Sequence, residues 1–184
     1  MGGDRPAGVP LRLVHLKDPC LVYTHESLRL AEQLIAALRA HGLKAATVES
    51  CTGGLVAGCI TAIAGSSAVF ECGFVTYANE AKHDLVGVPA ALIARVGAVS
   101  EEVARAMAEG ALSAAPVDAA VAVTGVAGPG GGTTDKPVGL VHIAAARTGH
   151  ATLHERHQFP GDRTAIRQAS VDAALCCLMR VVSS

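Results

Sequence analysis

Hydroxyl and glycine residues are concentrated in the segment 49–54, ESCTGG, between a short apolar stretch and a helical pattern. A turn from strand to helix presents such side chains beside the unpaired N–H groups of the helix start, where an anion or an oxyanion can bind. The alternative is an ordinary cap, in which Ser50 or Thr52 satisfies the first helical turn. At a helix start, Gly53 and Gly54 each lower helix stability by roughly 1 kcal/mol relative to alanine. Glycine at both positions therefore indicates that another group approaches the backbone closely there.

Tyr77 and Lys82 form a second candidate group, in the segment 76–82, TYANEAK. Tyr77 lies at the end of a strand-like stretch, and Lys82 lies on the helix that we expect to follow it. A lysine becomes a useful base only when burial or a neighbouring cation lowers its pKa. An exposed Lys82 would be an ordinary surface charge, and the local sequence leaves both interpretations open.

A glycine-rich segment, residues 124–134, follows a continuous apolar strand and carries five glycines in eleven residues. These glycines provide free N–H groups and leave room for a phosphate or a ribose to lie against the main chain. The alternative is a mobile connection between two strands. The segment is not a P-loop, because no Gly-Lys-Ser/Thr follows and the next element has the pattern of a strand.

Arg163 and Arg167 lie one turn apart near the start of the last expected helix. Two guanidinium groups beside helix N–H groups suit a phosphate, although a pair of solvated arginines would have the same spacing. The eight histidines show no His-Glu-x-x-His motif and no pairing with cysteine at zinc spacing, so we predict neither a metal site nor a cofactor.

The elements that position these residues follow from hydrophobic periodicity and turn signals. Strands without a polar face, alternating with helices, predict a single-domain three-layer α/β/α sandwich around a largely buried sheet. Residues 1–25 are an extension of uncertain order, and residues 26–184 form the domain. The expected elements are a helix at 27–40, a strand at 45–49, a helix at 55–63, a strand at 70–77, a short helix at 79–85, a helix at 100–114, strands at 119–124 and 138–146, an edge strand at 152–159 and a helix at 162–178.

Composition excludes several classes of protein. The chain of 184 residues is 51% hydrophobic and 17% charged, which excludes disorder for most of its length. A net charge of -1 and an aromatic content of 3% argue against a nucleic-acid partner. The apolar runs are too short to span a membrane. The start of the chain lacks a secretory signal, and the six cysteines include no C-x-x-C pair, so we expect a cytoplasmic protein with reduced thiols.

Taken together, the candidate segments resemble the C-terminal domain of the competence/damage-inducible protein CinA, the nicotinamide-nucleotide amidohydrolase (PncC) family. The matching stretches follow the order of the family and cover roughly residues 27–180. They are VESCTGG at 48–54, YANEAK at 77–82, LVGVP at 85–89, GAVSEEVA at 97–104, AVTGVAGPGGG at 122–132, KPVG at 136–139 and FPGDR at 159–163.

The resemblance implies hydrolysis of the carboxamide of nicotinamide mononucleotide, which gives nicotinic acid mononucleotide and ammonia in pyridine-nucleotide recycling. It implies Ser50 as the nucleophile and Lys82 as the base, and within this picture the Gly53–Gly54 backbone is a candidate oxyanion hole. It also implies a homo-oligomer. Further residues expected near the phosphate, the ribose or the ring of the substrate are Tyr77, Asn79, Thr124, Gly128, Gly130 and Arg163.

Three alternatives stay open at the level of sequence. Cys51, beside Ser50, is a rival nucleophile. The substrate can be another pyridine nucleotide or a small amide. In a different class altogether, the chain can be a non-catalytic nucleotide-binding or interaction module related to CinA, although the joint presence of Ser50, Lys82, Thr124 and Arg163 favours an enzyme.

Overall fold

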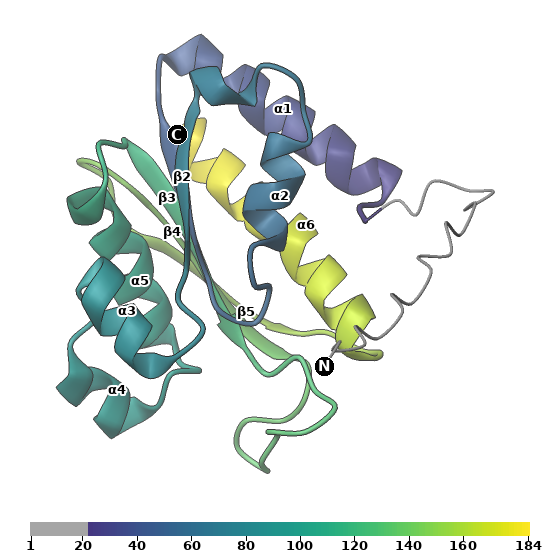
Figure 1. Cartoon of the computed structure of the whole chain (residues 1–184), viewed down its shortest axis with the longest axis vertical. Helices are drawn as coiled ribbons and strands as arrows, with labels where there is room; N and C mark the ends of the chain where they lie inside the picture. Colours follow the sequence, from purple (N-terminus) through teal and green to yellow (C-terminus); the bar gives the residue numbers. More distant parts are fainter. Residues whose placement is uncertain (1–21) are drawn as a thin grey trace, which may run out of the picture.

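A five-stranded β-sheet separates the helices of the protein into two layers (Figure 1). The computed structural model describes residues 22–184, so the expectation for the extension 1–25 falls almost wholly outside the described residues. The strand order is β2-β1-β3-β4-β5, with β2, β1 and β3 parallel and β4 and β5 antiparallel to their neighbours. The strands are β1 (Ala45–Glu49), β2 (Phe70–Val75), β3 (Ala119–Gly125), β4 (Leu140–Arg147) and β5 (Leu153–Gln158).

The helices cover both faces of this sheet (Figure 1). One face carries α1 (His25–His41), α2 (Leu55–Thr61) and α6 (Arg163–Val182). The other carries α3 (Asn79–Val86), α4 (Ala90–Val96) and α5 (Glu101–Ala114). A short 3-10 turn, η1 (Ser66–Ala68), precedes β2. The three-layer α/β/α architecture expected from the sequence is therefore confirmed.

The central strands are buried on both faces, and their side chains alternate between the two layers. In β1, Ala46 and Val48 pack in the cluster under α5, whereas Ala45 packs in the cluster under α1 and α6. Because the period of a strand is two, Thr47 and Glu49 lie on the same face as Ala45, the face that α2 covers. The edge strands β2 and β5 are only partly buried, as expected for 152–159.

The helix ends follow the signals in the sequence. Thr24 Oγ1 accepts a hydrogen bond from the Ser27 N–H at the start of α1, and Gly42, in the left-handed region with φ of 64°, ends it. The expected helix at 100–114 is α5, with Ser100 as its cap. Two helices differ from expectation: α4 was not predicted, and α6 continues to Val182.

The connections between the parallel strands determine where a ligand can bind. The chain passes from β1 to β2 through α2 on one face, and from β2 to β3 through α3, α4 and α5 on the other. Sheets of this kind bind ligands at the carboxyl ends of strands where the connections diverge, here β1 and β3. The loop that follows β3 is closed at its base by two backbone hydrogen bonds of 2.8 Å, from Val126 N–H to Leu140 O and from Gly139 N–H to Val126 O.

Candidate functional site

Ser50 and Lys82 meet at the carboxyl end of β1. Ser50 is the first residue after the strand, and its N–H donates to Val123 O of β3 at 3.0 Å. Lys82 reaches the same point from α3, and its Nζ lies 3.2 Å from Ser50 Oγ. This distance allows proton transfer between the two side chains. The two residues are 32 positions apart in sequence, so the fold creates the pair.

Lys82 is buried, with 1% of its surface exposed, and this burial lowers its pKa below the ordinary value of 10.5. The largest cause is desolvation, which penalises the ammonium, while the charges of Cys51 and Glu80 act in the opposite direction. Lys82 Nζ also donates to Thr76 O at 2.7 Å. In its neutral form, an amine that donates to Thr76 O can accept the proton of the Ser50 hydroxyl, which is the arrangement of a general base. The surface-charge interpretation of Lys82 is wrong.

The start of α2 is already occupied by a carboxylate of the chain itself. Glu49 is 1% exposed, and its oxygens accept hydrogen bonds from the N–H groups of Gly54 at 2.9 Å, Val56 at 3.0 Å and Ala57 at 2.8 Å. The Gly53 N–H donates to Ser50 O at 3.1 Å. The Gly53–Gly54 backbone therefore supplies no free donor, which contradicts the expected oxyanion hole at these two N–H groups. Their conformation explains the glycines, because φ is 60° at Gly53 and 95° at Gly54.

Cys51 is a poor nucleophile in this environment, although it borders the same cavity as Ser50. It is 6% exposed, and burial raises the pKa of its thiol to about 11. The thiolate is the reactive form, so Cys51 is almost wholly unreactive at neutral pH. Within residues 22–184, the N–H groups of Cys51 and Thr52 donate to no other residue. The N–H of the residue after a nucleophile is a common oxyanion donor.

A cavity of about 270 Å³ opens beside Ser50. The glycine-rich loop lines much of this cavity, and Arg163 borders the cavity from the start of α6. Arg163 Nη1 donates to Gly128 O at 2.9 Å, and its Nη2 lies 3.4 Å from Tyr77 Oη. The cavity thus brings together four of the eight residues expected to bind a substrate: Tyr77, Gly128, Gly130 and Arg163. The lining residues are Ser50, Cys51, Tyr77, Val99, Gly125, Val126, Ala127, Gly128, Gly130, Gly131 and Arg163.

Arg167 performs a different task from Arg163, although the two lie one turn apart. Its Nη2 donates to Thr52 O at 2.8 Å and so ties α6 to the turn that carries Ser50. Thr52 is fully buried, and its Oγ1 has no hydrogen-bond partner among the described residues. The two arginines expected to bind a phosphate together therefore lie apart in function. Arg163 borders the cavity, and Arg167 donates to the turn that carries Ser50.

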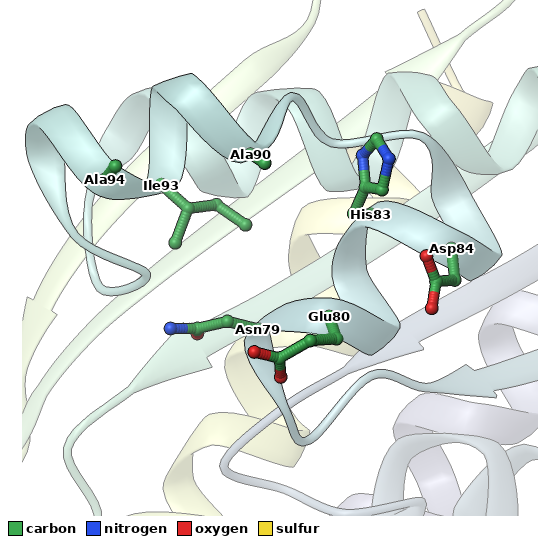
Figure 2. A pocket seen from close by; sticks show the side chains of 7 residues that line it. All are labelled: Asn79, Glu80, His83, Asp84, Ala90, Ile93 and Ala94. Atoms are coloured by element: carbon green, nitrogen blue, oxygen red, sulfur yellow. The ribbon is translucent and has the colours of Figure 1, made fainter.

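Two expected site residues lie elsewhere. Asn79 borders a separate hollow of about 390 Å³ between α3 and α4, where it lies across from Ile93 (Figure 2). Thr124 is 1% exposed and its Oγ1 donates to Ala98 O at 2.9 Å, so it holds the segment that includes Val99. Neither residue is among those that line the cavity at Ser50. The family resemblance placed both near the substrate, whereas the structure places neither among the residues that line this cavity.

Residues 22–184 contain no group of three or more His, Cys, Asp or Glu side chains arranged to hold a metal ion. Nor does any helix in this range have the length and apolar character needed to cross a membrane. Sequence reasoning gives Glu49 no role, yet the structure buries its carboxylate at the start of α2. A glutamate at the end of an apolar strand was the available signal, because a buried charge requires several partners.

Comparison with known proteins gives a consistent family. The model of the CinA C-terminal domain matches residues 27–182. Nicotinamide-nucleotide amidohydrolase PncC of Escherichia coli (strain K12) is 51% identical over 150 residues, which cover 82% of this chain and 91% of that protein. The competence/damage inducible protein CihA from Agrobacterium tumefaciens has the same fold, with a TM-score of 0.85 and 45% identity over 88% of this chain and 98% of that chain.

Several relatives are much longer than this chain. A CinA-like protein of Geobacter sulfurreducens is 50% identical over 174 residues, which are 94% of this chain but 41% of the relative. A CinA-like protein of Akkermansia muciniphila is 51% identical over 150 residues, which are 36% of its length. The chain thus spans well under half of these CinA-like relatives. With a family model that matches nearly all of the described residues, the chain belongs to the CinA C-terminal domain family.

Proposed function

We propose that the protein is a nicotinamide-nucleotide amidohydrolase, which converts nicotinamide mononucleotide and water into nicotinic acid mononucleotide and ammonia. The observation that carries the proposal is the 3.2 Å approach of Ser50 Oγ to the buried Lys82 Nζ, at the edge of a cavity bordered by Arg163. The similarity to PncC of Escherichia coli supports the choice of substrate.

In the first half of the reaction, neutral Lys82 takes the proton of the Ser50 hydroxyl while Oγ attacks the carboxamide carbon. The tetrahedral intermediate collapses when the carbon–nitrogen bond breaks, and Lys82 gives its proton to the departing nitrogen, which leaves as ammonia. The product of this half is an ester between Ser50 and the nicotinoyl group. Water then attacks the ester with Lys82 again as base, the acid is released, and the proton returns to Ser50.

The charge that develops on the carboxamide oxygen needs donors directed at it. We assign this role to the N–H of Cys51, with that of Thr52 beside it, in place of the engaged Gly53 and Gly54 groups. This assignment uses the backbone of the residue that follows the nucleophile, as in other serine hydrolases.

For the rest of the substrate, we propose that the phosphate binds to Arg163 and to backbone N–H groups around Gly128 and Gly130. Arg163 uses one nitrogen on Gly128 O, and its fork retains further donors. Tyr77 is 63% exposed at the cavity edge, where its ring can cover the pyridine or the ribose.

The test is release of ammonia from nicotinamide mononucleotide by the purified protein, without added metal. Ser50→Ala should lower turnover at least about a thousandfold, because no hydroxyl remains to attack. Cys51→Ala should lower it by less than about tenfold, since its thiol takes no part in the reaction. Circular dichroism of each variant checks the fold. A folded parent protein without turnover would contradict the proposal and favour the non-catalytic binding module, and equal turnover by Ser50→Ala would remove Ser50 as nucleophile.

We further propose a cytoplasmic location and self-association, both of which the family resemblance and composition favour. Among the described residues, Val75, Tyr77 and Leu85 expose large apolar side chains and offer a surface for a second copy. Light scattering on the purified chain measures its mass in solution, and a monomer at working concentrations would contradict self-association.

A further inference from the structure

We infer that Glu49 is a positioning residue for catalysis, whose carboxylate fixes the Ser50–Gly54 turn against α2 and so holds Ser50 Oγ at Lys82. The inference rests on the proposed function, because it concerns the nucleophile of that reaction. Glu49 touches neither Ser50 Oγ nor Lys82 Nζ, and its side chain is not among those that line the cavity.

The contacts of Glu49 satisfy both carboxylate oxygens. Oε2 accepts from Gly54 and Val56, and Oε1 accepts from Ala57 and from Thr47 Oγ1 at 3.2 Å. Burial of a carboxylate is costly unless it is hydrogen-bonded, and here four donors and the positive end of α2 compensate for the loss of water. The first helical turn has no other side-chain cap, because its capping position is Gly54.

Both ends of the nucleophile turn are held through the same residue. At the strand end, Glu49 O accepts from the Thr76 N–H at 2.8 Å, and Thr76 O in turn accepts from Lys82 Nζ at 2.7 Å. At the helix end, the Glu49 side chain holds Gly54, Val56 and Ala57. Ser50 therefore lies between two sets of hydrogen bonds that both involve Glu49. Lys82 is connected to the same backbone through Thr76.

The close approach of α2 to the sheet depends on a small residue opposite it. A Cβ at Gly73 of β2 would lie 2.9 Å from Ala57 Cβ and 2.9 Å from Thr47 Oγ1. Glycine at this position lets Ala57 and Thr47 reach Glu49 from both sides. This packing therefore places the N–H groups at the start of α2 against the Glu49 carboxylate. These N–H groups are then not free to bind an external anion.

This arrangement also limits where a substrate phosphate can bind. The helix N-terminus beside the nucleophile, normally an anion site, already holds an internal carboxylate. A second anion there would meet like charge without free donors. The phosphate is thus directed to the other side of the cavity, where Arg163 lies, and the carboxamide is left beside Ser50.

The test compares Glu49→Gln, Glu49→Ala and Thr47→Val with Glu32→Ala, an exposed carboxylate on α1. An amide cannot accept at both ends, so Glu49→Gln should lower kcat at least about tenfold while KM changes less than about threefold. Thr47→Val, which removes one donor and keeps the charge, should cause a smaller loss of kcat. Glu32→Ala should match the parent.

Chemical rescue separates positioning from general stability. In Glu49→Ala, sodium formate can occupy the space of the lost carboxylate and should restore part of kcat, relative to sodium chloride of equal ionic strength. Formate should leave the parent and Glu32→Ala unchanged. If Glu49→Ala does not fold, the kcat values of Glu49→Gln and Thr47→Val still test the positioning role. Unchanged kcat in folded Glu49→Gln would overturn the inference, as would a thermal destabilisation without loss of kcat below the melting temperature.

A second readout does not depend on the substrate. In Ser50→Cys, the pH dependence of alkylation by iodoacetamide at position 50, read by mass spectrometry, reports how closely Lys82 approaches the thiol. Adding Glu49→Gln should shift this profile to higher pH. If nicotinamide mononucleotide is not turned over but the shift occurs, the proposed function fails and the positioning role stands. If turnover is normal and neither kcat nor the profile responds to Glu49, only the positioning role fails.

Discussion

A buried lysine that contacts a serine hydroxyl determines the chemistry of the site. Lys82 keeps one hydrogen bond to a backbone carbonyl and one contact with Ser50, and it has no ion-pair partner among the described residues. Burial of an unpaired ammonium costs free energy, which lowers the pKa of Lys82 and favours the neutral amine that can act on Ser50.

The pH dependence of the reaction should report the titration of Lys82. Its pKa lies below the ordinary 10.5, and only the neutral form accepts the Ser50 proton. As pH falls through this lowered pKa, Lys82 becomes protonated, so kcat/KM should fall on the acid side and reach a plateau on the alkaline side. Steady-state ammonia release from about pH 5 to about pH 11.5 measures the profile, and this range includes the ordinary lysine value of 10.5.

Lys82→Arg provides the control for this titration. Arginine retains the positive charge but does not deprotonate, so turnover should be lost at every pH. A flat profile in the parent, with chemistry as the limiting step, would contradict Lys82 as the base. A midpoint at the ordinary lysine value would contradict its desolvation.

The site was only partly predictable from sequence at the level of single residues. The resemblance to the CinA family assigned roles to Ser50 and Lys82, whereas local spacing alone left a helix cap and a surface charge open. The burial of Lys82 arises from packing that no local pattern encodes. Glu49 was missed because three of its four partners are backbone N–H groups, which are the same in every sequence. Gly53 and Gly54 were interpreted as donors, whereas their positive φ values show that the turn needs them for its shape.

Among the elements, α3 is held in place by its contact with α5. A Cβ added at Gly110 of α5 would lie 1.8 Å from Val86 O at the end of α3. The obstacle is backbone, which cannot move aside as a flexible side chain does. The position of α3, and with it that of Lys82, thus depends on the absence of a side chain at one residue of a neighbouring helix.

Gly110→Ala should therefore affect both stability and catalysis. Overpacking of this kind costs about 1–3 kcal/mol of unfolding free energy, despite the higher helix propensity of alanine. Displacement of α3 should also lower kcat about tenfold or more, because Lys82 moves with it. Urea unfolding and ammonia release measure the two effects. Ser113→Ala, at an exposed position of the same helix, should change neither stability nor kcat. A Gly110→Ala variant as stable and active as the parent would show that α3 can shift without affecting Lys82.

Most elements were predictable because periodicity and caps are local signals. The end of α1 follows from Gly42, and the start of α5 follows from Ser100. The seven-residue α4 was missed, since a helix this short, directly after the Gly87–Pro89 interruption, offers too few turns for a period to emerge. Strand order and the change to antiparallel pairing at β4 depend on contacts between distant segments, which periodicity does not report.

At the scale of the whole molecule, the candidate site lies in the parallel part of the sheet. The parallel strands β2, β1 and β3 carry the site at their carboxyl ends, whereas β4 and β5 form an antiparallel extension. In this extension, His142 Nδ1 lies 3.0 Å from His154 Nε2, and the two rings stack with centroids 5.2 Å apart. One of the two imidazoles must be a neutral acceptor for this hydrogen bond to form.

Acid should destabilise the fold through this histidine pair. Burial, followed by the nearby His154, lowers the pKa of His142 from 6.5 to about 4. Between these values the unfolded chain binds more protons than the folded one, so the free energy of unfolding falls as pH drops from 6.5 towards 4. The loss for this group is at most about 3 kcal/mol.

Urea unfolding at about pH 7 and about pH 5 measures this effect. His142→Phe keeps a planar ring without a titratable group, and its stability should depend less on pH than that of the parent. His150→Gln, at an exposed turn, should retain the dependence of the parent. An equal loss of stability in the parent and in His142→Phe would assign the acid sensitivity to other groups.

The two hydrogen bonds that close the base of the loop after β3 have a consequence for how this domain can diversify. Because Val126 pairs with Leu140 and Gly139, the register of β3 against β4 is fixed at the base of the loop, and we expect changes in length within residues 129–135 to leave it unshifted. Transplanting this segment between homologues should exchange their ligand preferences while the nucleophile and its base stay in place.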